Sequence, residues 1–288
     1  MKDEVKYYEQ MKSSIIDKFR LIDHLVGETV LEIGFGGGGL TMEMLYNGYD
    51  VYGIDSSIIS LQKAQAPMIK RQKEKMFLCD AFDAFKFFKG MKFDNIVLSS
   101  VLHEIFSYKR NEYIGYNKGN IGVANEIVED KTIFLLKQLT YLLNDGGKIL
   151  IRDGVGIEPS KSFNMCSIKI DEKEKEIFDI WYSKYPKVSN MYVYDNGILT
   201  MHKSNMMEFM YTLTWGKDGI DRESQETYGV FSGDQIIKLG DRIGMNVVHY
   251  EEYLQDGYKE FFEHLDFKDI TAEHSMLPSS NQIVIYQK

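Results

Sequence analysis

Short apolar runs alternate along the chain with longer segments in which apolar residues recur every three or four positions. The short runs predict buried strands at residues 30–33, 50–54, 76–79, 93–100, 148–152, 246–250 and 281–287. The longer segments predict amphipathic helices at residues 4–26, 40–45, 121–143 and 233–245. Strands and helices that alternate in this way predict an α/β fold with a doubly wound, mostly parallel sheet.

The first predicted strand runs into a glycine cluster within Val-Leu-Glu-Ile-Gly-Phe-Gly-Gly-Gly-Gly-Leu, residues 30–40. Glycine adopts backbone conformations closed to other residues and has no side chain, so a ligand can lie directly on such a turn. Gly34, Gly36 and Gly39 satisfy the G-x-G-x-x-G pattern of dinucleotide sites, where a pyrophosphate sits at a helix N-terminus. Glu32 would place a negative charge beside that anion, whereas the same carboxylate suits a ligand that carries an ammonium group. Both kinds of ligand remain open at this point.

Two further predicted strands end in acids. Asp55 closes the second strand about twenty residues beyond the glycines, where a carboxylate can accept hydrogen bonds from ribose hydroxyls. It can also cap the next helix together with Ser56. Asp80 follows the third strand and either faces a ligand or caps a turn. Since parallel strands bring their carboxyl ends to one edge of a sheet, both acids and the glycine turn are expected to lie together.

With these residues together, the chain resembles the class I S-adenosylmethionine-dependent methyltransferases. The first motif of that family, E/D-x-G-x-G-x-G, is matched by Glu32, Gly34, Gly36 and Gly38. The resemblance implies that the glycines approach the methionine portion of S-adenosylmethionine, with Glu32 near its amino group. It also implies an enzyme that transfers a methyl group by in-line displacement and releases S-adenosylhomocysteine.

The resemblance assigns roles further along the chain. Asp55 would hold the ribose, Asp80 would face the adenine amino group, and the backbone N–H of Ala81 would meet an adenine ring nitrogen. Ser99, a further candidate cofactor contact, lies in F-D-N-I-V-L-S-S, which resembles the fourth motif that leads toward the transferred methyl group. Enzymes that methylate exocyclic amines of DNA bases carry N-P-P-Y or D-P-P-Y here. This chain has neither, so that activity is disfavoured.

The resemblance covers residues 1–155 and 228–288, and it implies a seven-stranded sheet whose last strand enters antiparallel between the fifth and sixth. Residues 156–227 are longer than the connection that such a sheet needs, and they predict an inserted, mainly helical cap that selects the substrate. Substrate contacts are also expected at three tyrosines, Tyr108, Tyr113 and Tyr116.

His103 follows the fourth predicted strand and is the candidate general base, because an imidazole can take a proton from a hydroxyl or an amine near neutral pH. It can equally pack or hydrogen-bond at the turn, and Glu104 can orient it or cap the next helix. Arg152 and Asp153, at the end of the fifth strand, can contact the substrate or pair with each other, and the pair is the favoured expectation. A base is optional in this chemistry, because the sulfonium is a good leaving group and alignment supplies much of the acceleration.

Charge and composition limit the partners. The net charge is −9 and the isoelectric point is about 5.3, so no general basic field draws the chain to nucleic acid or to an anionic membrane. Cys79 and Cys166 predict neither a disulfide framework nor a metal site, and no apolar run is long enough to span a membrane. We therefore expect a cytoplasmic enzyme that uses no metal.

The sequence favours a small-molecule acceptor that is methylated on oxygen or nitrogen. Three alternatives remain. An RNA or protein methyltransferase would have the same core, with the cap as its docking surface. A dinucleotide oxidoreductase would fit the glycine turn but not Glu32 and Asp80. A non-catalytic module would bind S-adenosylmethionine and act only by interaction.

Overall fold

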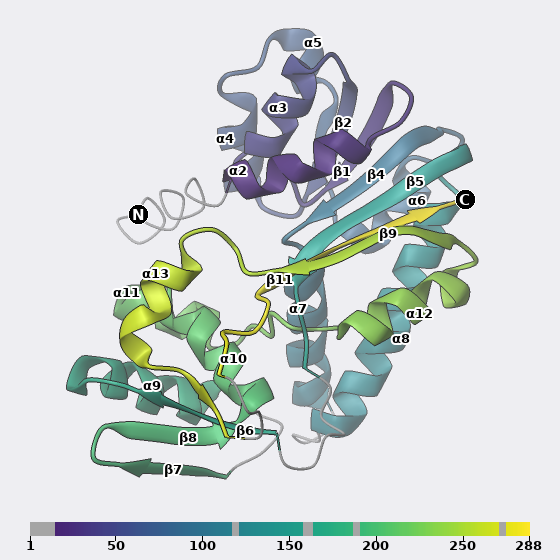
Figure 1. Cartoon of the computed structure of the whole chain (residues 1–288). Coiled ribbons are helices and arrows are strands. Elements are labelled where there is room, and N and C mark those ends of the chain that lie inside the picture. Colours follow the sequence, from purple (N-terminus) through teal and green to yellow (C-terminus); the bar gives the residue numbers. More distant parts are fainter. Residues whose placement is uncertain (1–14, 117–120, 158–163, 187–190, 271–274) are drawn as a thin grey trace.

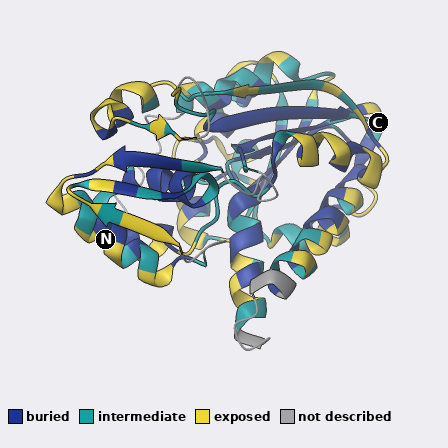
Figure 2. Ribbon diagram, turned by 60° about the horizontal axis from the view of Figure 1, so that its bottom comes forward, coloured by how far each residue is buried: buried dark blue, intermediate teal, exposed yellow. Residues whose placement is uncertain are grey.

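The computed structural model describes residues 15–116, 121–157, 164–186, 191–270 and 275–288. Within these ranges the chain forms a seven-stranded sheet with helices on both faces, and beside it a smaller four-stranded sheet with its own helices (Figure 1). Burial is concentrated in the strands and in the helix faces turned toward them (Figure 2).

The large sheet has the strand order β3-β2-β1-β4-β5-β11-β9, and only the two pairs made by β11 are antiparallel. Its last strand thus enters antiparallel between the fifth and sixth, and the predicted fold class is confirmed. The strands are β1 (Thr29–Ile33), β2 (Asp50–Asp55), β3 (Met76–Leu78), β4 (Phe93–Ser99), β5 (Leu143–Gly154), β9 (Asn246–Tyr253) and β11 (Asn281–Gln287).

Apolar clusters cover both faces of this sheet. On one face Leu21 and Leu40 pack with Val51, and on the other Leu136 and Ile236 pack with strand residues that point the opposite way. The surrounding helices are α2 (Ile15–Lys18), α3 (Gly39–Tyr46), α4 (Ile58–Gln65), α5 (Lys70–Lys73), α6 (Ala84–Phe87), α7 (Leu102–Tyr116), α8 (Ile121–Thr140) and α12 (Gly233–Ile243), with 3-10 segments η1 (Phe19–His24) and η2 (Ala81–Asp83). None of the helices in the described ranges combines the length and hydrophobicity needed to cross a membrane.

The start of β5 differs from the prediction. The fifth strand was predicted at residues 148–152, but β5 already begins at Leu143. Its register against β4 shifts between Phe93 and Asn95, and Gly146 has a φ of 76°. The glycine pair therefore forms an irregularity within the strand, where a left-handed residue is tolerated.

The region predicted as a mainly helical cap contains strands of a small antiparallel sheet, which the sequence did not predict. Its order is β10-β6-β8-β7, and its core centres on Phe178, Trp181 and Phe209. Phe262 and Leu265 pack into the same core, so this core also includes residues beyond 227. Its elements are β6 (Met165–Lys169), α9 (Glu172–Lys184), β7 (Tyr192–Asp195), β8 (Ile198–His202), α10 (Lys203–Leu213), α11 (Gly216–Glu223), α13 (Tyr258–Phe262), η3 (Glu263–Leu265) and β10 (Lys268–Asp269).

Candidate functional site

The glycine turn between β1 and α3 has a conformation that favours glycine. Gly34, Gly36 and Gly38 have φ angles of 71°, 53° and 79°. A Cβ atom at Gly34 would lie 2.3 Å from Cγ2 of Val101, and one at Gly38 would lie 2.8 Å from Cβ of Ala64. Backbone geometry and close neighbours therefore both require glycine at these two positions. Gly34 and Gly36 line a large cavity.

Glu32 and Asp55 lie on the wall of the same cavity. Glu32 is buried, its Oε2 accepts a 2.6 Å hydrogen bond from the Thr41 hydroxyl, and burial raises its pKa to about 7. Asp55 accepts hydrogen bonds from the backbone N–H groups of Gly36 at 2.9 Å and Ser57 at 2.8 Å. Burial raises the pKa of Asp55, while these two hydrogen bonds act in the opposite direction. Asp55 thus joins the glycine turn to the start of α4.

Asp80, Ala81 and Ser99 complete this part of the wall. Asp80 caps η2, since its Oδ1 accepts a 2.9 Å hydrogen bond from the N–H of Phe82. Ser99 ends β4, and its buried hydroxyl has no hydrogen-bond partner among the described residues. Buried hydroxyls are nearly always bonded to something, so Ser99 is a place where a ligand or water is expected.

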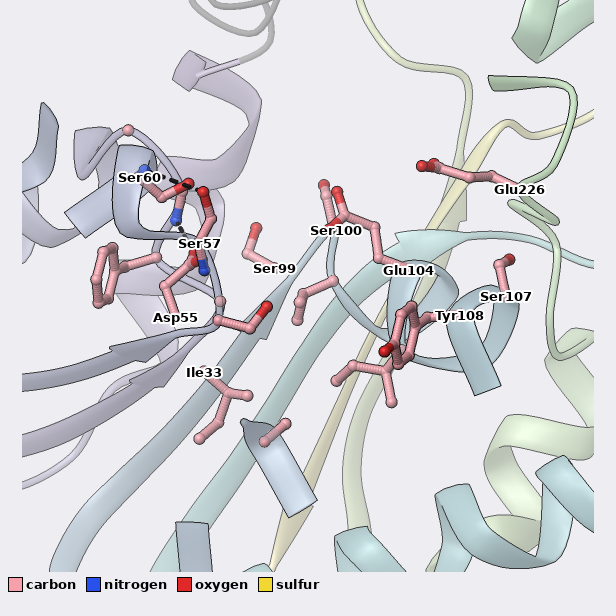
Figure 3. A pocket seen from close by; sticks show the side chains of 18 of the residues that line it. Ile33, Asp55, Ser57, Ser60, Ser99, Ser100, Glu104, Ser107, Tyr108 and Glu226 are labelled. Carbon is pink, nitrogen blue, oxygen red and sulfur yellow. Dashed lines mark hydrogen bonds between the residues drawn. The ribbon is translucent and has the colours of Figure 1, made fainter. Parts of the chain in front are cut away.

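The cavity has a volume of about 1410 Å³ and extends from the glycine turn to α7 and the cap (Figure 3). Its far half is lined by Glu104 and Tyr108 of α7 and by Trp215, Glu223 and Glu226 of the cap side. In Figure 3 Glu104 and Glu226 reach into it from different elements. The cavity therefore has a glycine-rich half and an acidic, partly aromatic half.

The three predicted substrate tyrosines differ in position. Tyr108 lines the cavity, and Tyr113 is not among its lining residues. The side chain of Tyr116 lies outside the part of the chain that the structure describes.

Lys18 of α2 is a cavity residue that sequence reasoning missed. Its side chain is only 8% exposed, and it makes no hydrogen bond or ion pair with any described residue. Burial lowers its pKa to about 8, helped by the charge of Arg152, although Glu32 acts in the opposite direction. A buried cation without a partner is costly, so this position is suited to an anionic ligand group.

His103 is buried at the start of α7, directly behind the acidic half of the cavity. Its Nδ1 lies 2.6 Å from Oδ1 of Asp153, and its backbone N–H donates to the other carboxylate oxygen at 3.2 Å. Its Nε2 faces Oε2 of Glu226 at 3.6 Å. Burial lowers the pKa of His103, but Asp153 and the nearby glutamates more than offset this and raise it to about 10. Glu226 lies in the cavity wall, whereas His103 is not among the lining residues.

The acidic half carries more negative than positive charge. Arg222 lies 3.4 Å from Glu226 and 3.7 Å from both Glu104 and Glu223. Burial, followed by the charge of Glu226, raises the pKa of Glu104 to about 7, and burial with neighbouring acids also raises the pKa of Glu226 and Glu223. Three carboxylates around one guanidinium suit a further cationic group.

The predicted pair of Arg152 with Asp153 is wrong. Arg152 binds Asp17, with its Nε donating to Oδ2 at 2.7 Å, and its Nη1 donates to the Ser100 hydroxyl at 2.6 Å. Asp153 pairs with His103 instead. Successive residues of a strand point to opposite faces, so neighbours in β5 meet different partners.

Comparison with known proteins supplies the family. The chain matches the model of a family described as a methyltransferase domain over residues 7–250. No curated protein matches the chain.

The fold is similar to that of solved structures. With an S-adenosylmethionine-dependent methyltransferase from Archaeoglobus fulgidus it shares 10% identity and a TM-score of 0.54, over 96% of this chain and 94% of that one. With one from Mesorhizobium loti it shares 14% identity and a TM-score of 0.50, over 92% of each chain. A third match, the mitomycin 7-O-methyltransferase MmcR, has 10% identity and a TM-score of 0.47 over 96% of this chain. The chain spans only 54% of that protein's length.

Proposed function

The chain belongs to the class I S-adenosylmethionine-dependent methyltransferases, and from this premise we propose that it methylates an oxygen or nitrogen atom of a small molecule in the cytoplasm. The observation that supports the proposal is a large cavity that has a glycine-rich half, suited to the cofactor, and an acidic half, suited to an acceptor. Both described cysteines are free, which fits a reducing compartment.

In this proposal the glycine-rich half holds the cofactor. Gly34 and Gly36, which line the cavity, let the backbone approach its methionine portion, and Gly38 lets the turn pack against Ala64 of α4. Glu32 faces the ammonium group, and Lys18 faces the carboxylate, so the two charges of the amino-acid end of the cofactor each meet the opposite charge. Since both side chains are buried, these interactions gain strength from the low local dielectric.

Asp55, Asp80, Ala81 and Ser99 hold the remainder of the cofactor in this proposal. Asp55 accepts hydrogen bonds from the ribose hydroxyls while it keeps the glycine turn in place. Asp80 and the N–H of Ala81 meet the adenine edge. The hydroxyl of Ser99, which has no partner among the described residues, lies at the passage toward the acceptor half.

When bound, S-adenosylmethionine supplies a methyl group activated by its sulfonium. The chain then needs to hold the acceptor atom in line and to keep water out. Tyr108 and Trp215 supply apolar surface for the acceptor, and Glu104 and Glu226 orient its polar end. Because the pKa of His103 is raised to about 10, its ring is protonated near pH 7, so it stabilises the carboxylate of Glu226 rather than taking the acceptor proton itself. We propose residues 156–227 as the region that selects the acceptor.

The acidic half works against an RNA acceptor. Glu104, Glu223 and Glu226 would repel phosphate groups, and among the lining residues near them only Arg222 and Lys109 are basic. A small, neutral or cationic acceptor fits this wall better.

The first experiment is titration calorimetry with S-adenosylmethionine, S-adenosylhomocysteine and NADH. Wild type and Asp55→Ala are compared, with Asp145→Ala as a control at a fully exposed position outside the cavity. We expect micromolar binding of the two sulfur ligands, lost only in Asp55→Ala, and no binding of NADH. A folded wild-type protein that binds neither sulfur ligand would refute the proposal. Binding without transfer of labelled methyl groups to any acceptor would leave the non-catalytic module as the better description.

A further inference from the structure

Three potential metal ligands converge behind and within the acidic half of the cavity. His103, Glu104 and Glu226 each offer one donor atom, and these atoms all lie within 4.8 Å of one another. Nε2 of His103 makes no hydrogen bond to a described residue, and Oε2 of Glu226 lies 3.6 Å away, beyond hydrogen-bond reach. Nε2 therefore has Glu226 as an ion-pair partner at 3.6 Å but no ligand at bonding distance among the described residues.

The imidazole is already oriented for coordination. Asp153 bonds Nδ1 at 2.6 Å and the His103 backbone N–H at 3.2 Å, and it accepts a third hydrogen bond of 2.8 Å from the N–H of Gly154. This fixes Nδ1 as the nitrogen bound to the carboxylate and leaves Nε2 as the nitrogen that a metal ion would bind in place of a proton. Histidines that bind metals usually donate their other ring N–H to a carboxylate in the same way.

We propose that His103, Glu104 and Glu226 bind a divalent transition-metal ion, such as Mn²⁺ or Zn²⁺, at the acceptor end of the cavity. This inference rests on the proposed methyltransferase function and specifies the acceptor. Metal–ligand bonds of about 2.0–2.2 Å place two ligands of one ion about 3.0–3.5 Å apart, so only small side-chain rotations are needed. One imidazole with two carboxylates favours such ions over Mg²⁺ or Ca²⁺, which prefer all-oxygen sites.

Arg222 is the competing cation at this place. Its Nε lies 3.4 Å from Oε1 of Glu226 and its Nη2 lies 3.7 Å from Oε1 of Glu104. Glu226 turns its other oxygen toward His103, so the guanidinium and an ion approach this carboxylate from different sides. Arg222 is about half exposed at 51%, and its long side chain can move outward without a large cost.

The ion would select an acceptor with an oxygen donor. Coordination lowers the pKa of a hydroxyl, which then loses its proton to solvent. A lone pair of that oxygen forms the new bond to the methyl carbon, and the electron pair of the broken C–S bond goes to sulfur. The products are a methyl ether or ester and neutral S-adenosylhomocysteine. In this arrangement His103 acts as a ligand rather than as a base.

The test is metal binding by the full chain after removal of metals with EDTA. Free Mn²⁺ is followed by electron paramagnetic resonance, and Co²⁺ is used as an absorption probe of imidazole ligation. Glu226→Gln and His103→Gln remove one ligand each, and Asp153→Asn removes only the orienting group. Glu223→Gln is the matched control, because it deletes a negative charge from the same wall without deleting a proposed ligand.

We expect one saturable site in wild type, weakened at least about 10-fold by the two ligand changes and about 10-fold by Asp153→Asn. Glu223→Gln should change the affinity by no more than about threefold, as expected for loss of one nearby charge. No binding at millimolar Mn²⁺ or Co²⁺, or binding that ignores Glu226→Gln and His103→Gln, would overturn the proposal. Binding of S-adenosylmethionine is measured on the same samples. If wild type does not bind S-adenosylmethionine, the assignment of the cavity to a methyltransferase is rejected. If wild type binds S-adenosylmethionine but no metal ion, only the metal site is rejected.

Discussion

Replacing Lys18 by methionine should make the cofactor-free protein more stable and its cofactor binding weaker. The two side chains have similar length, so Lys18→Met keeps the packing and removes the charge. Lys18 is almost fully buried in the cavity wall and has no hydrogen-bond or ion-pair partner among the described residues. The buried charge lowers the stability of the cofactor-free protein, so removing it should raise that stability. The same charge should attract an anionic group of the cofactor, so removing it should weaken cofactor binding.

The stability effect can be worked out from the pKa. Burial lowers the pKa of Lys18 from 10.5 to about 8. At 1.36 kcal/mol per unit, the charged side chain destabilises the folded state by about 3 kcal/mol at pH 7. The unfolded state binds more protons between pH 8 and 10.5, so the free energy of unfolding of wild type should rise through that window. Lys18→Met should be about 3 kcal/mol more stable at pH 7, with its melting temperature raised by about 6 °C, and should lack this rise.

Cofactor binding should change in the opposite direction. A lost hydrogen bond between charged groups is worth about 1.5–3 kcal/mol, which corresponds to about 10- to 100-fold weaker binding of S-adenosylmethionine. Denaturant unfolding at several pH values and calorimetry measure the two effects, with the 91% exposed Lys70→Met as control. If Lys18→Met destabilises the protein, or binds the cofactor as tightly as wild type, the assignment of Lys18 to the carboxylate is wrong.

Three further substitutions test the cofactor half, and a fourth, Gly48→Ala, is a control outside it. Gly34→Ala should lower the free energy of unfolding by about 2–4 kcal/mol, because its methyl group would overlap Val101. Gly48→Ala, with a φ of 89° but no atom within 4 Å of the added carbon, should cost only about 1 kcal/mol in the same denaturant assay. Asp55→Asn should weaken S-adenosylmethionine binding about 10- to 100-fold by calorimetry, and an unchanged affinity would contradict its role. Glu32 has a folded pKa of about 7 against 4.5, so the unfolding free energy should fall from pH 4.5 to 7 and this slope should disappear in Glu32→Gln.

The cofactor wall was predictable because its signals are local. A strand that ends in an acid and a run of glycines fix where the chain turns, and parallel strands then bring those turns together. Glu32, Asp55 and Asp80 come from three strands and line one cavity. Their individual contacts to the cofactor stay predictions, although their common position follows from the fold.

The acceptor half depends on contacts between distant parts of the chain. Arg152 selects Asp17, 135 residues away, instead of its neighbour Asp153, and this choice depends on which face of β5 each side chain occupies. Lys18 is unusual because the fold buries it in the cavity wall near the charge of Arg152, and neither effect can be read from the local sequence. Glu226 meets His103 across 123 residues, because a segment after α11 returns to α7. The strands of the cap were missed because β6, β7 and β8 have only four or five residues each, too short for a clear alternation.

The charges of the two halves are linked by the reaction itself. Positive charge leaves the sulfonium as the C–S bond breaks, so uncompensated negative charge nearby stabilises the reactant more than the transition state. Glu104, Glu223 and Glu226 would therefore slow methyl transfer if they stood alone at the acceptor end. Arg222 balances part of this negative charge at one oxygen of Glu226, and His103 lies near the other oxygen of the same carboxylate. A cationic acceptor or a metal ion would balance the rest, and its arrival would at the same time place the acceptor atom. An acidic wall of this kind favours reaction only when the acceptor site is occupied, and it thereby couples methyl transfer to correct binding.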